Sequence, residues 1–441
     1  METRAVPPWF DDAKLGIFVH WTAASVPAFA PVTDDPFSLA ATHGWEHAMA
    51  WSPYVEWYQN SLSIEGSPVW EHHRNVYGDL PYDAFVSTFL AGLSGWDPEP
   101  WVDLFASAGA KYVVLVTKHH DGVLLWPSSV PNPWRGASWQ SDRDVVGELA
   151  GAVRSRGLRF GAYYSGGLDW TFGGLPMTDF KRMFEAIPQT DDYVRYADAH
   201  WDELIERYEP SVLWNDIGYP AAADIEGLFA RYYTRVPDGV VNNRFDWLAQ
   251  SAGQRHTDFL TPEYSTAAPE GRKWEATRGI GSSFGYNADE PDDSYLAADA
   301  LIHLFVDVVA RGGNLLLNVG PNRDGIIPWG QAQRLLALGW WLRTNGPAIY
   351  GSRPWDRPAG KTGAGEEVRY TRGADGALYA IVLGAPTTDD VELDVAVDVG
   401  SQVTMLGNGD ALRYEPAPSG GTRITLPARP ATTPALTIRI A

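Results

Sequence analysis

Eight short apolar, β-prone runs recur through the first three quarters of the chain and set the strongest limit on its fold. Segments with helical apolar spacing lie between several of these runs. Buried strands that alternate with helices are typical of a parallel sheet, and eight of them predict a (β/α)8 barrel. The runs are GIFVHW (16–21), KYVVLV (111–116), RFGAYYS (159–165), SVLWND (211–216), VVNNR (240–244), DFLTPEY (258–264), SSFGYN (282–287) and NLLLNVG (314–320).

Several of the intervening helices have clear boundary signals. Asp97 is suited to be an N-cap with Pro98 at the first helical position, and Gly109 ends that segment. Asp142 or Asp144 begins the next helix, which ends at Gly157. Apolar spacing predicts further helices near residues 192–208, 222–235, 296–311 and 329–345.

We expect the barrel to be imperfect. The stretches that follow Arg244 and Glu263 are too short for a full helix with its loops. The Gly-, Pro- and Trp-rich stretch from about 27 to 95 is a long insertion after the first predicted strand. Long loops in compact domains are usually functional, so this stretch is predicted to form a lid or a substrate-binding loop.

The pattern changes from about residue 350. Short runs there alternate apolar and polar residues, and ADGA (374–377) is a hairpin signal. Antiparallel strands without helices predict a small β-sandwich, with the boundary near 351–365. We therefore expect a catalytic barrel over 1–350 and a C-terminal domain over 351–441. The alternating runs are VELDVAVDV (391–399), TRITL (422–426) and LTIRI (436–440).

Composition narrows the classes of partner. The 441 residues have a formal net charge of −21, which argues against binding to nucleic acid or to anionic membrane surfaces. The chain has no cysteine, so disulfides and thiolate metal sites are excluded. The first residues show no signal peptide and no apolar run is long enough for a membrane span, so we expect a cytoplasmic protein. The sequence is compatible with a homo-oligomer but does not specify one.

Polar residues stand at the carboxyl end of nearly every predicted barrel strand. In a (β/α)8 barrel these ends meet on the face that holds the active site. A single polar residue there is more often a cap, but the collection suits a polyhydroxylated ligand, with Trp21, Trp57, Trp214 and Phe284 as apolar walls. The polar residues are His20, His119, His120, Tyr163, Tyr164, Asp216, Arg244, Glu263, Tyr286, Asn287 and Asn318.

Two of these residues, Asp216 and Glu263, are carboxylates that could face each other across the barrel mouth. Glycoside hydrolysis needs such a pair, with one group to attack or activate water and one acid to protonate the leaving oxygen. The alternative makes Asp216 a helix N-cap and Glu263 half of an ion pair, and the residues alone do not choose between the two. The adjacent His119 and His120 also allow a metal site, but side chains of neighbouring strand residues point to opposite faces.

Ten ordered blocks of this sequence resemble the α-L-fucosidases of glycoside hydrolase family 29. The similarity extends from about Trp9 to Trp341, and the C-terminal part matches the family in its predicted architecture only. The blocks are WFDDAKLGIFVHW, SVPAF, EWY, AGAKYVVLVTKHHDGVLLWPS, GAYYSGGLDW, LWNDIGYP, VNNRF, TPEY, KWEATRGIGSSFGYN and GGNLLLNVGPNRDG.

The resemblance implies a retaining hydrolase of terminal α-L-fucose that needs no metal or organic cofactor. It assigns Asp216 as the nucleophile. The acid/base is Glu263 by the TPEY block, with Glu275 of the KWE block in reserve. The residues implied to contact fucose are His20, Glu56, Trp57, His119, His120, Tyr163, Trp214, Arg244 and Phe284.

Two positions depart from the family pattern, and two other functions stay open. Thr22 and Asn243 stand where the family usually has Gly and Asp, which affects the surroundings of the site rather than the reaction. One alternative is a fucose-binding protein without catalysis, which predicts the loss of one carboxylate. The other is a metal-dependent barrel hydrolase that uses His119, His120 and Asp216, and it predicts inactivation by chelators.

Overall fold

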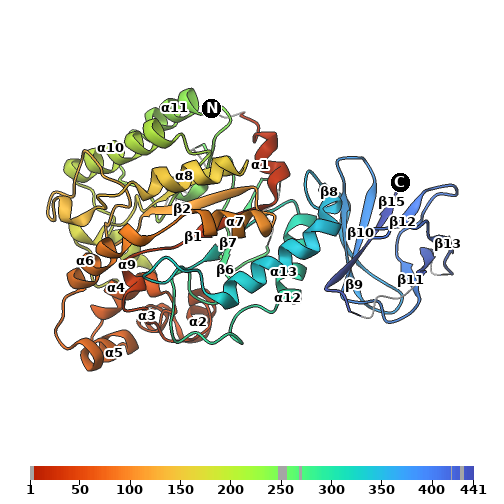
Figure 1. Ribbon diagram of the computed structural model, residues 1–441, viewed down its shortest axis with the longest axis horizontal. Coiled ribbons are helices and arrows are strands. Elements are labelled where there is room, and N and C mark those ends of the chain that lie inside the picture. Colours follow the sequence, from red (N-terminus) through yellow and green to blue (C-terminus); the bar gives the residue numbers. More distant parts are fainter. Residues whose placement is uncertain (1–3, 247–255, 268–270, 419, 428–431) are drawn as a thin grey trace.

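The computed structural model describes residues 4–246, 256–267, 271–418, 420–427 and 432–441. Its first part is a curled parallel sheet surrounded by helices, and its second part consists of antiparallel sheets beside α12 and α13 (Figure 1). Within the described residues, no helix is both long and apolar enough to cross a membrane.

The parallel sheet has seven strands in the order β5-β4-β3-β2-β1-β7-β6. Single parallel bridges pair Asn242 with Phe259 and Leu260 with Trp274, so a short link joins the β5 edge to the β6 edge. The predicted imperfect (β/α)8-like barrel is thereby confirmed. The strands are β1 (Leu15–Val19), β2 (Tyr112–Lys118), β3 (Arg159–Tyr164), β4 (Val212–Asn215), β5 (Val240–Val241), β6 (Glu275–Gly279) and β7 (Asn314–Val319).

Two predicted strands differ from the structure. Residues 258–264 make only single bridges, at Phe259, Leu260 and Glu263. Residues 282–287 form no strand, and the strand beside β7 is instead β6, which pairs Glu275 with Asn314. The β6 sequence EATRG contains no apolar run that would predict a strand. It begins with Glu275, a buried carboxyl group that bonds Tyr112 and Trp214. Gly285 in the rejected run donates its N–H to Glu56 Oε2 at 2.7 Å, so this segment bends over the barrel mouth.

The predicted helices are present with small shifts. Asp144 is the N-cap of α8, where its Oδ1 accepts Gly147 N–H at 2.9 Å. The cap of α7 is Pro98 rather than Asp97, although Asp97 Oδ1 accepts Glu99 N–H at 3.0 Å. The helices that pack around the sheet or precede it are α1 (Pro8–Ala13), α7 (Glu99–Ser107), α8 (Val145–Ser155), α10 (Asp191–Tyr208), α11 (Ile225–Arg235), α12 (Ala298–Ala310) and α13 (Trp329–Asn345).

The insertion after β1 is mostly helical rather than an open loop. Its helices and α9, which follows β3, gather at one side of the barrel (Figure 1). They are α2 (Pro36–His43), α3 (Trp45–Ala50), α4 (Tyr58–Leu62), α5 (Pro68–Tyr77), α6 (Tyr82–Gly92) and α9 (Phe180–Glu185).

The C-terminal strands form two antiparallel sheets over a separate apolar core, as predicted for a β-sandwich. The ADGA turn joins β9 to β10 with Gly376 at φ +80°, which favours glycine. One sheet has β8 (Arg353–Lys361), β9 (Glu367–Arg372), β10 (Leu378–Leu383), β12 (Val403–Met405) and β15 (Ala435–Ile440). The other has β11 (Asp390–Leu393), β13 (Arg413–Pro416) and β14 (Thr422–Thr425).

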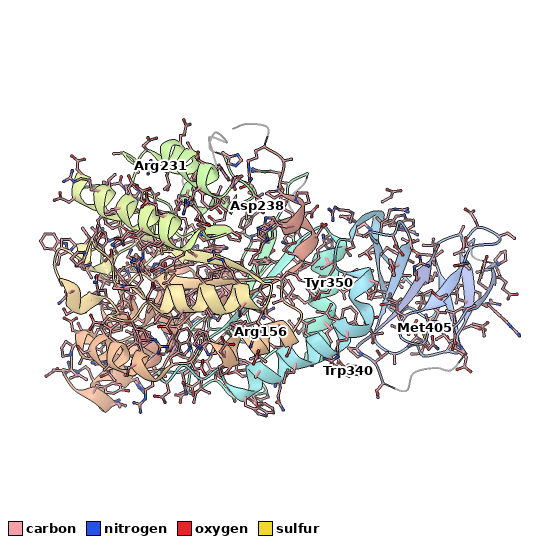
Figure 2. All side chains as sticks on the ribbon, turned by 45° about the horizontal axis from the view of Figure 1, so that its top comes forward. Arg156, Arg231, Asp238, Trp340, Tyr350 and Met405 are labelled. Carbon is pink, nitrogen blue, oxygen red and sulfur yellow. The ribbon has the colours of Figure 1, made fainter. Side chains whose placement is uncertain are left out.

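The helix α13 lies between the barrel and these sheets. Trp341 donates its indole N–H to Ala435 O at 3.0 Å, which fixes the helix to β15. The neighbouring Trp340 points away from the barrel at the edge of the molecule (Figure 2), and it is 63% exposed. The helix also packs against α7 and α12, and Leu335, Leu338 and Leu342 lie in the core of the barrel.

Candidate active site

An open cavity lies at the carboxyl ends of the barrel strands. Strand ends, the insertion and α9 all contribute to its wall. The lining residues are Phe18, His20, Pro36, Phe37, Trp45, Met49, Ser52, Tyr54, Glu56, Trp57, His119, His120, Tyr163, Phe180, Met183, Trp214, Asp216, Ile217, Arg244, Glu263, Thr277 and Phe284.

Asp216 follows β4 and opens into this cavity with 11% of its side chain exposed. Its Oδ1 accepts Arg244 Nη1–H at 2.9 Å and Ile217 N–H at 3.0 Å. Its Oδ2 accepts the Tyr163 hydroxyl at 2.8 Å. A guanidinium and two further donors therefore fix the orientation of this carboxyl group at the cavity wall.

Glu263 lies on the other side of the same guanidinium. Its Oε2 accepts Arg244 Nη2–H at 2.9 Å, and its Oε1 accepts the Tyr54 hydroxyl at 2.6 Å. Burial lowers the pKa of Arg244, but Asp216 and Glu263 outweigh burial and raise it above its usual value. Arg244 is therefore a fixed cation that holds two carboxylates near each other.

Neighbouring residues fix the orientation of Arg244. Its Nε–H donates to Thr261 Oγ1 at 2.9 Å, and its guanidinium lies 4.7 Å from the centre of a Trp214 ring. Asn243 accepts both the N–H and the hydroxyl of Thr261, at 3.0 and 2.9 Å. The Asn that replaces the family's usual Asp thus supports the residue that orients Arg244.

Both carboxylates precede a residue with a left-handed backbone. Ile217 has φ +53° and Tyr264 has φ +48°. Such values are unfavourable for residues other than glycine, above all for a β-branched one, and they concentrate at functional sites. The turn at Ile217 aims its own N–H at Asp216 Oδ1. The strain thus serves to position the carboxylate.

Glu275 lies elsewhere. It begins β6, is fully buried and does not line the cavity. Its Oε2 accepts the Tyr112 hydroxyl, and its Oε1 accepts the Trp214 indole N–H at 3.1 Å. Burial raises its pKa to about 7, against the effect of these hydrogen bonds. Glu275 therefore supports the cavity floor from below, whereas Glu263 faces the cavity.

Three histidines line the inner half of the cavity. His20 Nδ1 lies 2.6 Å from Asn318 Oδ1, and His120 Nδ1 lies 2.6 Å from Ser165 Oγ. The buried Nδ1 of His119 has no hydrogen-bond partner in the described protein. Burial lowers the pKa of all three, to about 3 for His20, so they are neutral and each can donate or accept one hydrogen bond.

The remaining walls of the inner half combine one acid with aromatic rings. Burial is the main cause that raises the pKa of Glu56 to about 8, so this carboxyl is protonated at neutral pH. Tyr163 and Trp214 stack with ring centres 5.4 Å apart, and Phe284 and Trp57 complete the lining. Hydroxyl-binding groups beside apolar rings are suited to one sugar ring that also carries an apolar substituent.

Some strand-end residues face away from the cavity. The Tyr164 hydroxyl lies 3.0 Å from His200 Nδ1, and Trp21 packs against Trp96 and Trp101 in the core. Asn287 bonds to Ala30 O at 2.9 Å. Tyr286 and Asn318 are also absent from the cavity lining, and Asn318 bonds His20 Nδ1 and donates its amide N–H to Phe284 O at 2.6 Å. The prediction that these residues line the ligand site was therefore wrong.

The metal-hydrolase hypothesis finds no matching arrangement. Across the parts of the chain that the structure describes, no three His, Cys, Asp or Glu side chains are grouped as metal ligands.

Sequence reasoning missed several lining residues. Tyr54 contacts Glu263, and its proximity to the EWY block was a usable signal. The lining residues of α2, α3 and α9 offered no signal, because these helices lie outside the repeating strand pattern.

Comparisons with known proteins agree with this geometry. A family model described as alpha-L-fucosidase matches residues 1–347, and one described as alpha-L-fucosidase C-terminal domain matches residues 362–441. The chain is 32% identical to the tissue alpha-L-fucosidase of Rattus norvegicus, covering 98% of this chain and 88% of that protein.

Solved structures of a Thermotoga maritima alpha-fucosidase are also similar. A complex with a mechanism-based inhibitor has 42% identity and a TM-score of 0.87, and a complex with fucose has 41% identity and a TM-score of 0.86. Each comparison covers 99% of this chain and 97% of the other. This chain therefore belongs to the α-L-fucosidases of glycoside hydrolase family 29.

Proposed function

We propose that this α-L-fucosidase removes terminal α-L-fucose by a retaining double displacement in which Asp216 is the nucleophile and Glu263 is the acid/base. The observation that carries the proposal is the shared cation: Arg244 bonds Asp216 and Glu263, both at 2.9 Å, and both open into one cavity. Bonding to one guanidinium suits the separation of about 5–5.5 Å between the carboxyl groups of retaining enzymes.

In the first step, Asp216 attacks the anomeric carbon. Oδ1 accepts hydrogen bonds from Arg244 and Ile217, whereas Oδ2 accepts one from the Tyr163 hydroxyl and is the better candidate for attack. As the bond to carbon forms, the glycosidic C–O bond breaks. The proton of Glu263 then passes to the leaving oxygen.

In the second step, water replaces the leaving group. Esterification removes the negative charge of Asp216, so Arg244 then stabilises the ionised form of Glu263 more strongly. Glu263 accepts a proton from the water while the water oxygen attacks the anomeric carbon and Asp216 is released. Fucose leaves with its original anomeric configuration.

The inner half of the cavity suits the sugar itself. The neutral imidazoles of His20, His119 and His120 can exchange hydrogen bonds with hydroxyl groups, and the Phe284 ring suits the C5 methyl group. The similar Thermotoga maritima enzyme has been solved in complex with fucose, which supports fucose as the sugar that this cavity binds.

The first test replaces Asp216 with glycine. Turnover of an aryl α-L-fucoside should be lost while thermal unfolding is unchanged, and azide should restore part of the turnover by attacking the anomeric carbon in place of the carboxylate. Near wild-type hydrolysis by Asp216→Gly would show that the nucleophile is another group.

The second test follows the wild-type reaction by proton NMR. Initial release of α-L-fucose is expected, and initial β-L-fucose would contradict a retaining mechanism. Binding of fucose without any turnover would support the non-catalytic alternative.

A further inference from the structure

The cavity has two unlike halves. The inner half carries the carboxylates, Arg244 and the histidines, whereas the outer half is formed by helices of the insertion and by α9. We call the outer set the aromatic wall. It consists of Phe37, Trp45, Met49, Phe180 and Met183.

The rings of the aromatic wall are already packed together. Trp45 and Phe180 stack with centres 4.5 Å apart and planes at 28°, and Phe37 meets Trp45 edge to face at 5.8 Å. Phe37 is 37% exposed, so the rings keep a face available beside the cavity. A stacked pair of rings from α3 and α9 is a preformed surface that loses little freedom when it binds another flat group.

Buried side chains beneath the rings hold them in place. Met49 and Met183 belong to one apolar cluster with Trp57 and Ile217. Ile217 directly follows Asp216, and Trp57 directly follows Glu56. The aromatic wall is therefore tied to the residues that surround the reacting carbon, and it lies next to the inner half.

Polar partners are scarce on this side. Ser52 is only 5% exposed, and its Oγ accepts Tyr54 N–H at 3.3 Å, while the Tyr54 hydroxyl is bonded to Glu263. A leaving group rich in hydroxyls would lose water here and gain few hydrogen bonds. A flat apolar group would gain burial and ring contacts.

We propose that the aromatic wall is the leaving-group subsite and that it favours aromatic aglycones attached to fucose. The inference rests on the proposed function, because it needs fucose in the inner half with its anomeric carbon at Asp216. Glu263 then protonates an oxygen whose substituent extends toward Trp45 and Phe180.

The test compares two substrates that share the sugar. One is 4-nitrophenyl α-L-fucoside, and the other is α-L-fucosyl fluoride, whose leaving group has no ring. Trp45→Ala and Phe180→Ala should each lower kcat/KM for the aryl fucoside by roughly 3- to 10-fold, since an aromatic pair contributes about 0.5–1.5 kcal/mol. The value for the fluoride should stay within about twofold.

Two further variants serve as controls. Phe180→Leu keeps an apolar side chain and should fold even if the alanine variant does not, while still losing part of the aryl preference. Trp51→Ala removes a tryptophan of the same insertion that is 42% exposed and lies outside the cavity lining. Trp51→Ala should leave kcat/KM unchanged for both substrates.

The possible results separate this inference from the proposed function. Equal losses for both substrates, or no loss for either, would overturn the leaving-group subsite. The variants could also lower kcat/KM for a fucosyl-galactose disaccharide as much as for the aryl fucoside. That result would show that the aromatic wall stacks on sugars, and it would overturn the preference for aromatic aglycones. If the wild-type enzyme hydrolysed neither the aryl fucoside nor the fluoride, this result would contradict the proposed function and the inference that rests on it.

Discussion

The two ends of the barrel both bury charged side chains but treat them differently. At the carboxyl ends of the strands, Arg244 bonds Asp216 and Glu263, whose side chains remain 11% and 12% exposed toward the cavity. At the opposite end, Lys273 donates to Asp11 Oδ1 and Asn314 Oδ1, both at 2.8 Å, and none of these three lines that cavity. We call Asp216, Arg244 and Glu263 the upper charge cluster, and we call Asp11, Lys273 and Asn314 the lower charge cluster.

The comparison shows that buried charge alone does not identify an active site. Lys273 also donates to Gly312 O at 3.0 Å, so its three N–H donors are used within the protein. In the upper cluster, the carboxylates keep edges that are exposed to the cavity. Polar groups that are held rigidly beside an open cavity are available to a ligand.

The largest expected effect separates two glutamates, one in the cavity and one beneath it. Glu263→Gln should lower kcat/KM by about 10²- to 10⁴-fold for a fucoside with a poor leaving group, because no proton is supplied. Glu275→Gln should lower kcat/KM by less than about tenfold, since it disturbs only the buried contacts with Tyr112 and Trp214. Kinetics with leaving groups of different acidity measure both.

The dependence on the leaving group is the decisive control. The loss in Glu263→Gln should shrink as the leaving group becomes more acidic, whereas the loss in Glu275→Gln should be the same for every substrate. The reverse pattern would make Glu275 the acid/base.

The next effect compares the two central cations. Arg244→Met leaves two buried carboxylates without their shared partner, and loss of a buried partner typically costs about 3–5 kcal/mol. We expect kcat/KM to fall by at least about 100-fold, with Arg244→Lys as the variant that keeps the charge. Lys273→Met should lower the free energy of unfolding and leave kcat/KM within about threefold. Equal kinetic losses in both would remove the distinction between the clusters.

The sequence predicted the part of the fold that depends on local pattern. The strands β1, β2, β3, β4 and β7 are buried along almost their whole length, so their residues form apolar runs that can be recognised. The strand β6 escaped recognition because Glu275 and Arg278 interrupt it. Glu275 is tolerated there only because Tyr112 and Trp214 lie opposite it, and such partners come from distant parts of the chain.

The candidate site divides in the same way. Asp216, Arg244 and Glu263 could be selected because strand ends of a barrel converge, and the family resemblance added Glu56. Whether Tyr164 or Tyr163 faces the cavity depends on alternation within one strand, which an apolar run of six residues does not fix. The aromatic wall depends on how the insertion helices pack over the barrel mouth, and no repeating pattern encodes that.

A smaller effect concerns Glu56, the protonated acid of the upper end. Burial raises its pKa to about 8, so above pH 8 Glu56 becomes negatively charged beside the other two carboxyl groups of the site, Asp216 and Glu263. Binding of a fucose-based inhibitor should weaken by about tenfold from pH 7 to pH 9. Glu56→Gln keeps a donor without the charge and should bind with less dependence on pH.

The same group links pH to stability. The folded protein retains a proton on Glu56 that the unfolded chain, with a usual pKa of 4.5, has released, so the contribution of Glu56 to stability falls as the pH rises from 4.5 through about 8.

The binding prediction has its own contradicting outcome. If inhibition of the wild type and of Glu56→Gln depended on pH in the same way, the Glu56 proton would have no part in binding.

The smallest effect concerns Lys14 at the lower end of the barrel. Replacing Lys14 should raise the free energy of unfolding, whereas replacing Lys273 should lower it. Burial, followed by repulsion from Lys273, lowers the pKa of Lys14 to about 7, and its buried amine lies 3.5 Å from Asp11 without a hydrogen bond. Asp11 has better partners in Lys273 at 2.8 Å and Arg353 at 3.0 Å, so Lys14→Met leaves no unpaired charge there.

The variant should therefore be more stable than wild type by on the order of 1 kcal/mol near pH 6, where the buried amine is charged. Burial of the Lys14 amine destabilises the folded wild type most below pH 7. This destabilisation declines as the pH rises from 7 toward 10.5, where Lys14 of the unfolded chain also loses its proton. Urea unfolding at pH 6 and pH 9 should show a larger gain at pH 6, with kcat/KM unchanged. A loss of stability at both values would mean that the Lys14 amine is part of the lower cluster's stabilising network, and the two ends of the barrel would then differ only in the space left for a ligand.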